Sequence, residues 1–96
     1  MMTKVKALLV EDIDAVRVTP GAYEFTVRHG EEDPCGMIFN CPCGCGREGY
    51  LPFKPEPSPS WLWDGNREAP TLRPSVLQIG GCRWHGFLTA GEWRSC

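Results

Sequence analysis

The alternation of apolar and polar positions predicts short β-strands. In AYEFTVRH, residues 22–29, Tyr23, Phe25 and Val27 alternate with polar residues, as in a half-buried strand. No window repeats apolar residues at the spacing of an amphipathic helix. The 11 glycines and 9 prolines interrupt the chain throughout. We therefore predict a mostly-β fold, a small antiparallel sheet or barrel-like domain with little or no helix.

Several further segments read as strands or extended chain. KPEPSPS, residues 54–60, has a proline at every second position, so it cannot donate a regular ladder of hydrogen bonds. We interpret it as an extended connector; a ligand for another domain is the alternative. The other predicted strands or extended segments are 5–10, 14–18, 37–40, 48–53, 61–66, 69–79 and a terminal hairpin over 85–96 that turns at Ala90-Gly91.

A chain of 96 residues predicts one domain, 1–96, with N-terminal strands in 1–36 and a knuckle-containing core in 37–96. So short a chain buries little surface and is often stabilised by a metal or by disulfides. Six cysteines are present. The N-terminal apolar run is too short for a signal peptide and is interrupted by Glu11, Asp12 and Asp14. We therefore predict a cytoplasmic protein without a membrane segment, in which clustered thiols bind metal.

The densest group of cysteines is NCPCGCG, which holds Cys41, Cys43 and Cys45 within five residues. CRWH supplies Cys82 and His85 at C-x-x-H spacing. Zinc prefers four thiolate or imidazole ligands in a tetrahedron, whereas a disulfide between cysteines two apart is strained. These residues predict that the β-domain has zinc-knuckle hairpins with one structural zinc, held by four of the five residues, with Cys96 as a further possible ligand and Cys35 outside the site.

The sequence gives weaker evidence for a catalytic site than for a metal site. His29–Glu31 resembles the H-x-E of zinc deaminases, but the cysteine element is one residue too short and too close. A cysteine nucleophile with His85 as its base has nothing to orient it. Ser75 lacks a nucleophile-elbow motif and reads as a turn hydroxyl. Four protein ligands would leave no zinc position for water, so we predict a protein that is not an enzyme.

Charge and aromatic residues bear on the choice of partner. The formal net charge is −2 and no basic stripe is present, which disfavours duplex nucleic acid. Single-strand binding by stacking remains open because tryptophans lie near arginines. The same rings could serve as core or as anchors for a protein partner. The candidate contact residues are Trp61, Trp63, Trp84, Trp93, Arg73 and Arg83, with Arg94 nearby.

Three segments together resemble a known family: FNCPCGCG, WLWDGNREAPTLRPSV and CRWHGFLTAGEWRSC. The family comprises small proteins of unknown function, encoded mainly by tailed bacteriophages, prophages and other mobile bacterial loci, some labelled ammonia monooxygenase. The resemblance covers about residues 37–96. It implies a phage-associated zinc-binding β-domain whose metal group is drawn from Cys41, Cys43, Cys45, Cys82, His85 and Cys96. Some relatives lie beside bacterial ubiquitin-like modification genes, which implies protein partners without identifying them.

These observations predict a structural-zinc protein of phage type that acts as a protein-interaction or assembly module in the cytoplasm of a bacterial host. The partner is expected to be a phage or host protein, and association with the virion and the oligomeric state stay open. Two alternatives are a zinc module that binds single-stranded nucleic acid and a zinc-dependent enzyme.

Overall fold

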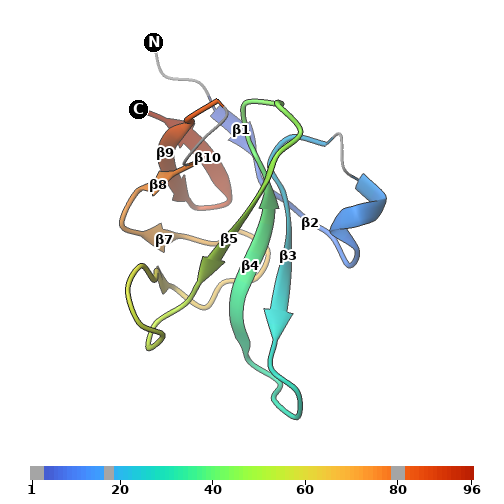
Figure 1. The fold of residues 1–96 in the computed structure, drawn as a ribbon, viewed down its shortest axis with the longest axis vertical. Helices are drawn as coiled ribbons and strands as arrows, with labels where there is room; N and C mark the ends of the chain where they lie inside the picture. The colour runs from blue at the N-terminus through green and yellow to red at the C-terminus, as the bar shows by residue number, and fades with distance from the viewer. Residues whose placement is uncertain (1–3, 17–18, 79–81) are drawn as a thin grey trace.

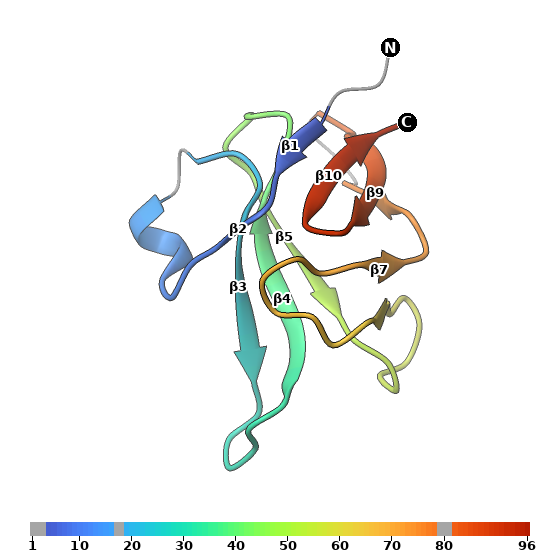
Figure 2. The same cartoon turned by 180° about the vertical axis from the view of Figure 1, so that it is seen from behind.

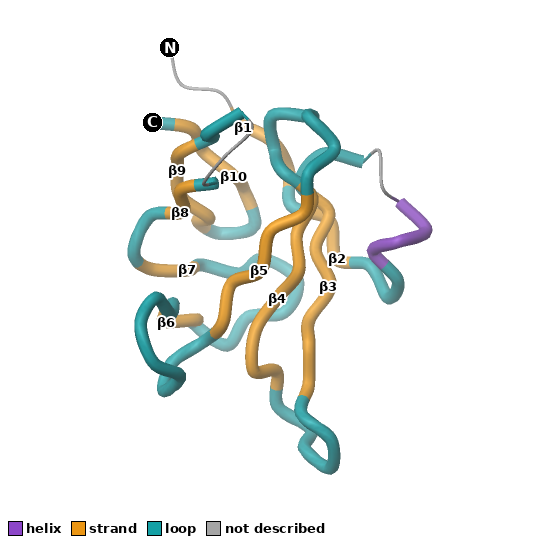
Figure 3. Tube along the Cα trace, viewed as in Figure 1, coloured by secondary structure: helices purple, strands orange, loops and turns teal. Residues whose placement is uncertain are grey.

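The computed structural model describes residues 4–16, 19–78 and 82–96. The elements are β1 Lys4–Lys6, β2 Leu8–Leu9, the 3-10 helix η1 Ile13–Val16, β3 Ala22–Val27, β4 Pro34–Asn40, β5 Glu48–Pro52, β6 Leu62–Trp63, β7 Leu72–Arg73, β8 Val76–Leu77, β9 His85–Thr89 and β10 Glu92–Ser95. The predicted mostly-β fold with little helix is confirmed (Figure 3). Within these residues, no helix has the length and apolar character needed to cross a membrane.

The strands form two four-stranded sheets and a small two-stranded one. The first sheet has the order β1-β10-β9-β8, the second β2-β3-β4-β5, and β6 pairs with β7. The N-terminal segment belongs to both large sheets, because β1 pairs antiparallel with β10 and β2 then pairs parallel with β3. Figures 1 and 2 show the two large sheets side by side, with β1 next to β10. β8 and β5 are therefore edge strands of their sheets.

The core lies where the two sheets meet, around the fully buried indole of Trp93 on β10. The ring of Phe39 on β4 stacks on it, with ring centroids 4.9 Å apart. The indole Nε1 donates a 2.9 Å hydrogen bond to the Gly21 carbonyl, so the ring is buried without an unsatisfied donor. Tyr23, Met37 and other large apolar side chains complete this cluster. One side chain thus contacts both sheets.

Two predicted hairpins are confirmed. β4 and β5 pair with Phe39 opposite Gly49, and their connecting loop carries the cysteine cluster. β9 and β10 pair through a two-residue turn in which Ala90 and Gly91 have φ of 49° and 77°. Both central residues of such a turn need positive φ. Residues 54–60 pair with no regular strand, as the prolines predict, but they form turns and bends and not the predicted extended connector.

The predicted strand over 14–18 is wrong where it can be compared. Ile13–Val16 is a 3-10 helix with Ile13 buried. The Asp12 carboxylate accepts the amide of Asp14, and the Asp12 carbonyl accepts that of Ala15. Asp side chains favour such local turns over strand pairing. Residues 17 and 18, and Ile79 of the predicted segment 69–79, lie outside the described residues.

The position of Trp93 generates a stability prediction. Trp93→Ala should lower the free energy of unfolding by about 3–5 kcal/mol, because it leaves a large cavity where the sheets meet. Leu62→Ala is the matched control, because Leu62 is 57% exposed and its truncation should cost less than about 0.5 kcal/mol. Chemical denaturation measures both values. Similar losses for the two variants would contradict this account of the core.

Candidate metal centre and neighbouring Ser-His pair

The loop between β4 and β5 carries three of the cysteines. The Cys41 amide donates to the Arg47 carbonyl at 2.8 Å, which closes the loop, and the Gly44 amide donates to the Cys41 carbonyl at 3.1 Å. Gly44 and Gly46 both have φ of 86°, in the left-handed region that glycine adopts without strain. The glycines alternating with the cysteines therefore allow the chain to turn sharply and direct the thiols to one side.

The fourth cysteine comes from the other sheet. Cys82 lies between β8 and β9, where the Gln78 amide donates to the Trp84 carbonyl at 2.7 Å and keeps the two strands paired. Its Sγ lies 3.3 Å from Cys41 Sγ, across 41 residues of sequence. In Figure 1 the loop after β4 comes up to the segment before β9. The cluster thus joins loops of the two large sheets.

The four sulfur atoms fit a tetrahedral metal. The Sγ atoms of Cys41, Cys43, Cys45 and Cys82 all lie within 4.8 Å of one another. The distance from Cys41 to Cys43 is 3.3 Å and that from Cys45 to Cys82 is 3.5 Å. A zinc–sulfur bond of about 2.3 Å separates the sulfurs of a tetrahedron by about 3.8 Å. The thiols are therefore close to the spacing that zinc requires, and the cluster could bind a metal ion.

The thiols differ in acidity. Burial raises the pKa of Cys41 far above the ordinary thiol value and also raises that of Cys43. Hydrogen bonds from the Cys43 thiol and from the Trp84 amide lower the pKa of Cys82 to about 7. One thiolate therefore forms readily near neutral pH. The buried Cys41 and the neighbouring Cys43, whose pKa is raised, keep their protons until a cation compensates the added charge.

The structure separates the predicted ligands into two groups. Cys41, Cys43, Cys45 and Cys82 form the cluster, while His85 and Cys96 are not part of it. Cys35, predicted to lie outside the site, has its Sγ 3.6 Å from Thr26 Oγ1.

The imidazole of His85 contacts a serine instead. His85 Nε2 lies 3.0 Å from Ser75 Oγ. Ser75 directly precedes β8, and His85 begins β9 opposite Leu77. The Ser75 carbonyl accepts a 3.2 Å hydrogen bond from the Trp61 indole, which ties the serine backbone to another segment. An imidazole Nε2 within hydrogen-bond distance of a serine hydroxyl is the arrangement of a nucleophile and its general base.

Ser75 was missed as a functional residue by the sequence reasoning. No elbow motif surrounds it, and ten residues separate it from His85. The usable signal was its place in PTLRPSV together with a histidine on the next predicted strand. In the described part of the chain, no carboxylate lies within ion-pair distance of the His85 ring. Ser75 and His85 therefore form a two-residue pair there.

The candidate aromatic contact residues are mostly packed inside. Trp93 is fully buried, and Trp61, Trp63 and Trp84 are partly buried against the core. The Trp63 ring stacks on Phe53 at 5.3 Å. Arg73 and Arg83 are exposed. The tryptophans thus contribute substantially to the hydrophobic core, and the proposed contact role of these residues stays a prediction.

Together these features define a class: a small two-sheet β protein with a four-thiol site and a Ser-His pair. The profile of one family, described as bacterial ubiquitination-like system serine protease (BubE), matches residues 10–96. The chain belongs to this family. No curated protein and no solved structure matches the chain.

Membership of this family corrects the prediction about enzymatic activity. The prediction that the protein is not an enzyme is wrong, because the family is one of serine proteases. The sequence argument looked for chemistry only at the metal and the cysteines. A closed metal site excludes metal-bound water, but it does not bear on a serine nucleophile elsewhere.

The cluster predicts one zinc per chain. Cys45→Ser and Cys82→Ser should each lower the zinc content and destabilise the fold, because metal binding is coupled to folding. Cys35→Ser is the matched control and should retain the metal, because Cys35 is outside the cluster. Elemental analysis of purified protein measures the content. Full zinc content in both cluster variants, or loss in Cys35→Ser, would contradict the assignment.

Zinc affinity should also depend on pH. Thiolates bind the metal, so binding releases protons, and acid must weaken it. The high pKa of Cys41 and Cys43 means that several protons leave on binding. The apparent affinity should fall by well over tenfold between about pH 8 and pH 6. Competition titration with a chromogenic chelator measures this, and an affinity independent of pH would exclude thiolate ligation.

Proposed function

We propose that this chain is a serine hydrolase that cleaves a peptide or related acyl bond in a bacterial ubiquitination-like system. Ser75 is the nucleophile and His85 is the general base. The 3.0 Å contact between His85 Nε2 and Ser75 Oγ carries the proposal. The family match over residues 10–96 supports the same class of chemistry.

The reaction follows from this geometry. Ser75 Oγ attacks the substrate carbonyl carbon, and His85 Nε2 accepts the hydroxyl proton as the C–O bond forms. The tetrahedral intermediate collapses, the C–N bond breaks, and His85 returns the proton to the leaving amine. Water then attacks the acyl-serine ester with His85 again as the base. This second step releases the carboxylic acid and restores the Ser75 hydroxyl.

The surroundings of Ser75 suit a substrate that extends in both directions. On the side of Pro74 a hollow of about 470 Å³ is lined by Arg73, Pro74 and Phe87, among others. On the side of Val76 a groove of about 460 Å³ begins at Val76 and Trp61. Phe87 is 46% exposed, so apolar surface is available beside the pair. A chain crossing Ser75 would contact protein on both sides of the scissile bond.

We assign the metal a structural role. Cys41, Cys43, Cys45 and Cys82 would supply all four ligands of a zinc ion, which leaves no position for a substrate or for water. The ion would compensate the charge of the thiolates and hold the loop between β8 and β9. The residues of the chain that do the chemistry are then Ser75 and His85, with Trp61 as a positioning residue for the serine backbone.

The partner implied by this role is a protein. A hydrolase of a ubiquitination-like system acts on a polypeptide, which agrees with the expected protein partner and gives the interaction a catalytic purpose. The phage association and the single-strand nucleic-acid alternative stay predictions.

Removal of either member of the pair should abolish hydrolysis. Ser75→Ala and His85→Ala should each lower the rate constant for p-nitrophenyl acetate by about 100-fold or more, because the nucleophile or its base is lost. Absorbance of released nitrophenolate measures the rate, and zinc content and melting temperature confirm folding of each variant.

Ser58→Ala is the matched control, because Ser58 is an exposed serine of the proline-rich connector. It should hydrolyse the ester at the unchanged rate. Folded, zinc-loaded Ser75→Ala protein that retained the original rate would overturn the proposed function.

A further inference from the structure

The edge of β8 presents backbone groups without partners in its sheet. The Gln78 amide donates to the Trp84 carbonyl, so Gln78 and, two residues earlier, Val76 occupy hydrogen-bonded positions opposite β9. Leu77, opposite His85, occupies the alternate position of an antiparallel pair, from which the N–H and C=O point away from β9. The Leu77 side chain is 50% exposed. An added strand could therefore hydrogen-bond to the Leu77 backbone.

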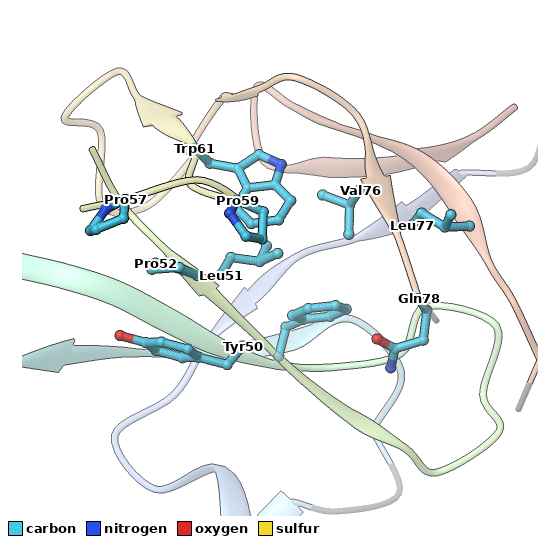
Figure 4. A pocket seen from close by; sticks show the side chains of 10 residues that line it. Tyr50, Leu51, Pro52, Pro57, Pro59, Trp61, Val76, Leu77 and Gln78 are labelled. Atoms are coloured by element: carbon cyan, nitrogen blue, oxygen red, sulfur yellow. The ribbon is translucent and has the colours of Figure 1, made fainter. Parts of the chain in front are cut away.

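An apolar groove runs along this edge. It has a volume of about 460 Å³, lies between β8 and the edge strand β5, and none of its lining residues is charged. Figure 4 shows Tyr50 and Leu51 on one side, Val76 and Leu77 on the other, and Trp61 with the prolines of the connector closing one end. Such a groove accommodates apolar side chains and disfavours charged ones, which would lose their hydration.

The groove borders the Ser-His pair, although neither member of the pair lines it. Val76, which lines it, directly follows Ser75. Trp61, which also lines it, donates its indole hydrogen bond to the Ser75 carbonyl. The groove thus ends next to Ser75, and a chain lying along the β8 edge would extend from it toward the serine hydroxyl. The nucleophile Ser75 is therefore followed directly in the chain by Val76 and Leu77, which form the edge strand and line the apolar groove.

We propose that the groove binds an extended, uncharged stretch of the protein substrate as an added strand on β8. The substrate backbone pairs with the Leu77 N–H and C=O, and alternate apolar side chains lie against Leu51, Trp61 and Val76. This inference rests on the proposed function, because it brings a substrate carbonyl to Ser75. The main-chain hydrogen bonds do not depend on the sequence of the substrate. Specificity comes from the groove, which requires an apolar side chain at every second residue of the substrate.

Peptide binding to catalytically inactive Ser75→Ala protein tests the groove without requiring turnover. The probes are two fluorescently labelled eight-residue peptides, one alternating leucine with threonine and one with lysine in place of each leucine. Fluorescence anisotropy gives the two dissociation constants. The leucine peptide should bind at least about tenfold more tightly, because lysine would place charges in the groove.

Leu77→Pro in the same background removes the edge N–H, and proline is tolerated on edge strands. It should weaken binding of the leucine peptide by about tenfold or more. Lys6→Pro is the matched control on β1, at the opposite edge of the same sheet, and should bind as the parent does. The Ala7 amide donates to the Gly91 carbonyl, so Lys6 also occupies an outward-facing position. Circular dichroism and zinc content verify that each variant is folded.

Equal affinity for the two peptides, absence of binding, or full affinity in folded Leu77→Pro protein would each overturn the proposal. These outcomes are separate from failure of the proposed function. Hydrolysis of p-nitrophenyl acetate depends on Ser75 and His85, whereas peptide binding is measured after Ser75 has been removed. If hydrolysis is observed and the peptide does not bind, the groove assignment is wrong. If the peptide binds and hydrolysis does not depend on Ser75, the proposed function is wrong.

Discussion

The meeting of four thiols from two hairpin loops is the constraint on which the rest of the structure depends. Cys41 and Cys82 are 41 residues apart, yet their sulfur atoms lie 3.3 Å apart. A domain of this size is stable by only about 5–15 kcal/mol. Structural zinc binds zinc-finger peptides with about 10–16 kcal/mol at neutral pH. The free energy of binding a zinc ion at this cluster would therefore be comparable with that of the whole fold, and the two sheets would depend on the ion as well as on the core around Trp93.

The same constraint acts on the proposed catalytic pair. Ser75 directly precedes β8 and His85 begins the neighbouring β9, and Cys82 comes three residues before His85 in the connection between these strands. A nucleophile and its base must be held to about 0.5 Å for chemistry. The metal would fix the loop on one side, and the Trp61 indole holds the Ser75 carbonyl on the other. A structural ion and a catalytic serine are thus compatible in one small domain.

Local sequence signals predicted much of the fold. The alternation in residues 22–29 and the Ala90-Gly91 turn are signals that act over a few residues, and each predicted the structure that is found. The strand predicted over 14–18 was wrong because the Asp12 side chain stabilises a turn, which alternation alone does not reveal. The pairing of β1 with β10 depends on contacts across the whole chain and has no local signature.

The candidate site was predicted in part for the same reason. Closely spaced cysteines and glycines directed attention to the metal cluster. The separation of His85 from the thiols depends on strand register: opposite Leu77, its ring reaches back toward Ser75. Register is a tertiary property. A serine after proline carries no signal of its own until β8 and β9 are paired.

The central claim is that His85 activates Ser75 in the metal-loaded protein. The most direct measurement is reaction with a fluorophosphonate probe, followed by mass spectrometry of the labelled peptides. The account predicts a single adduct on the peptide that contains Ser75, with labelling lost in folded His85→Ala protein. Labelling at another residue, no labelling of the zinc-loaded chain, or an unchanged rate without His85 would contradict it.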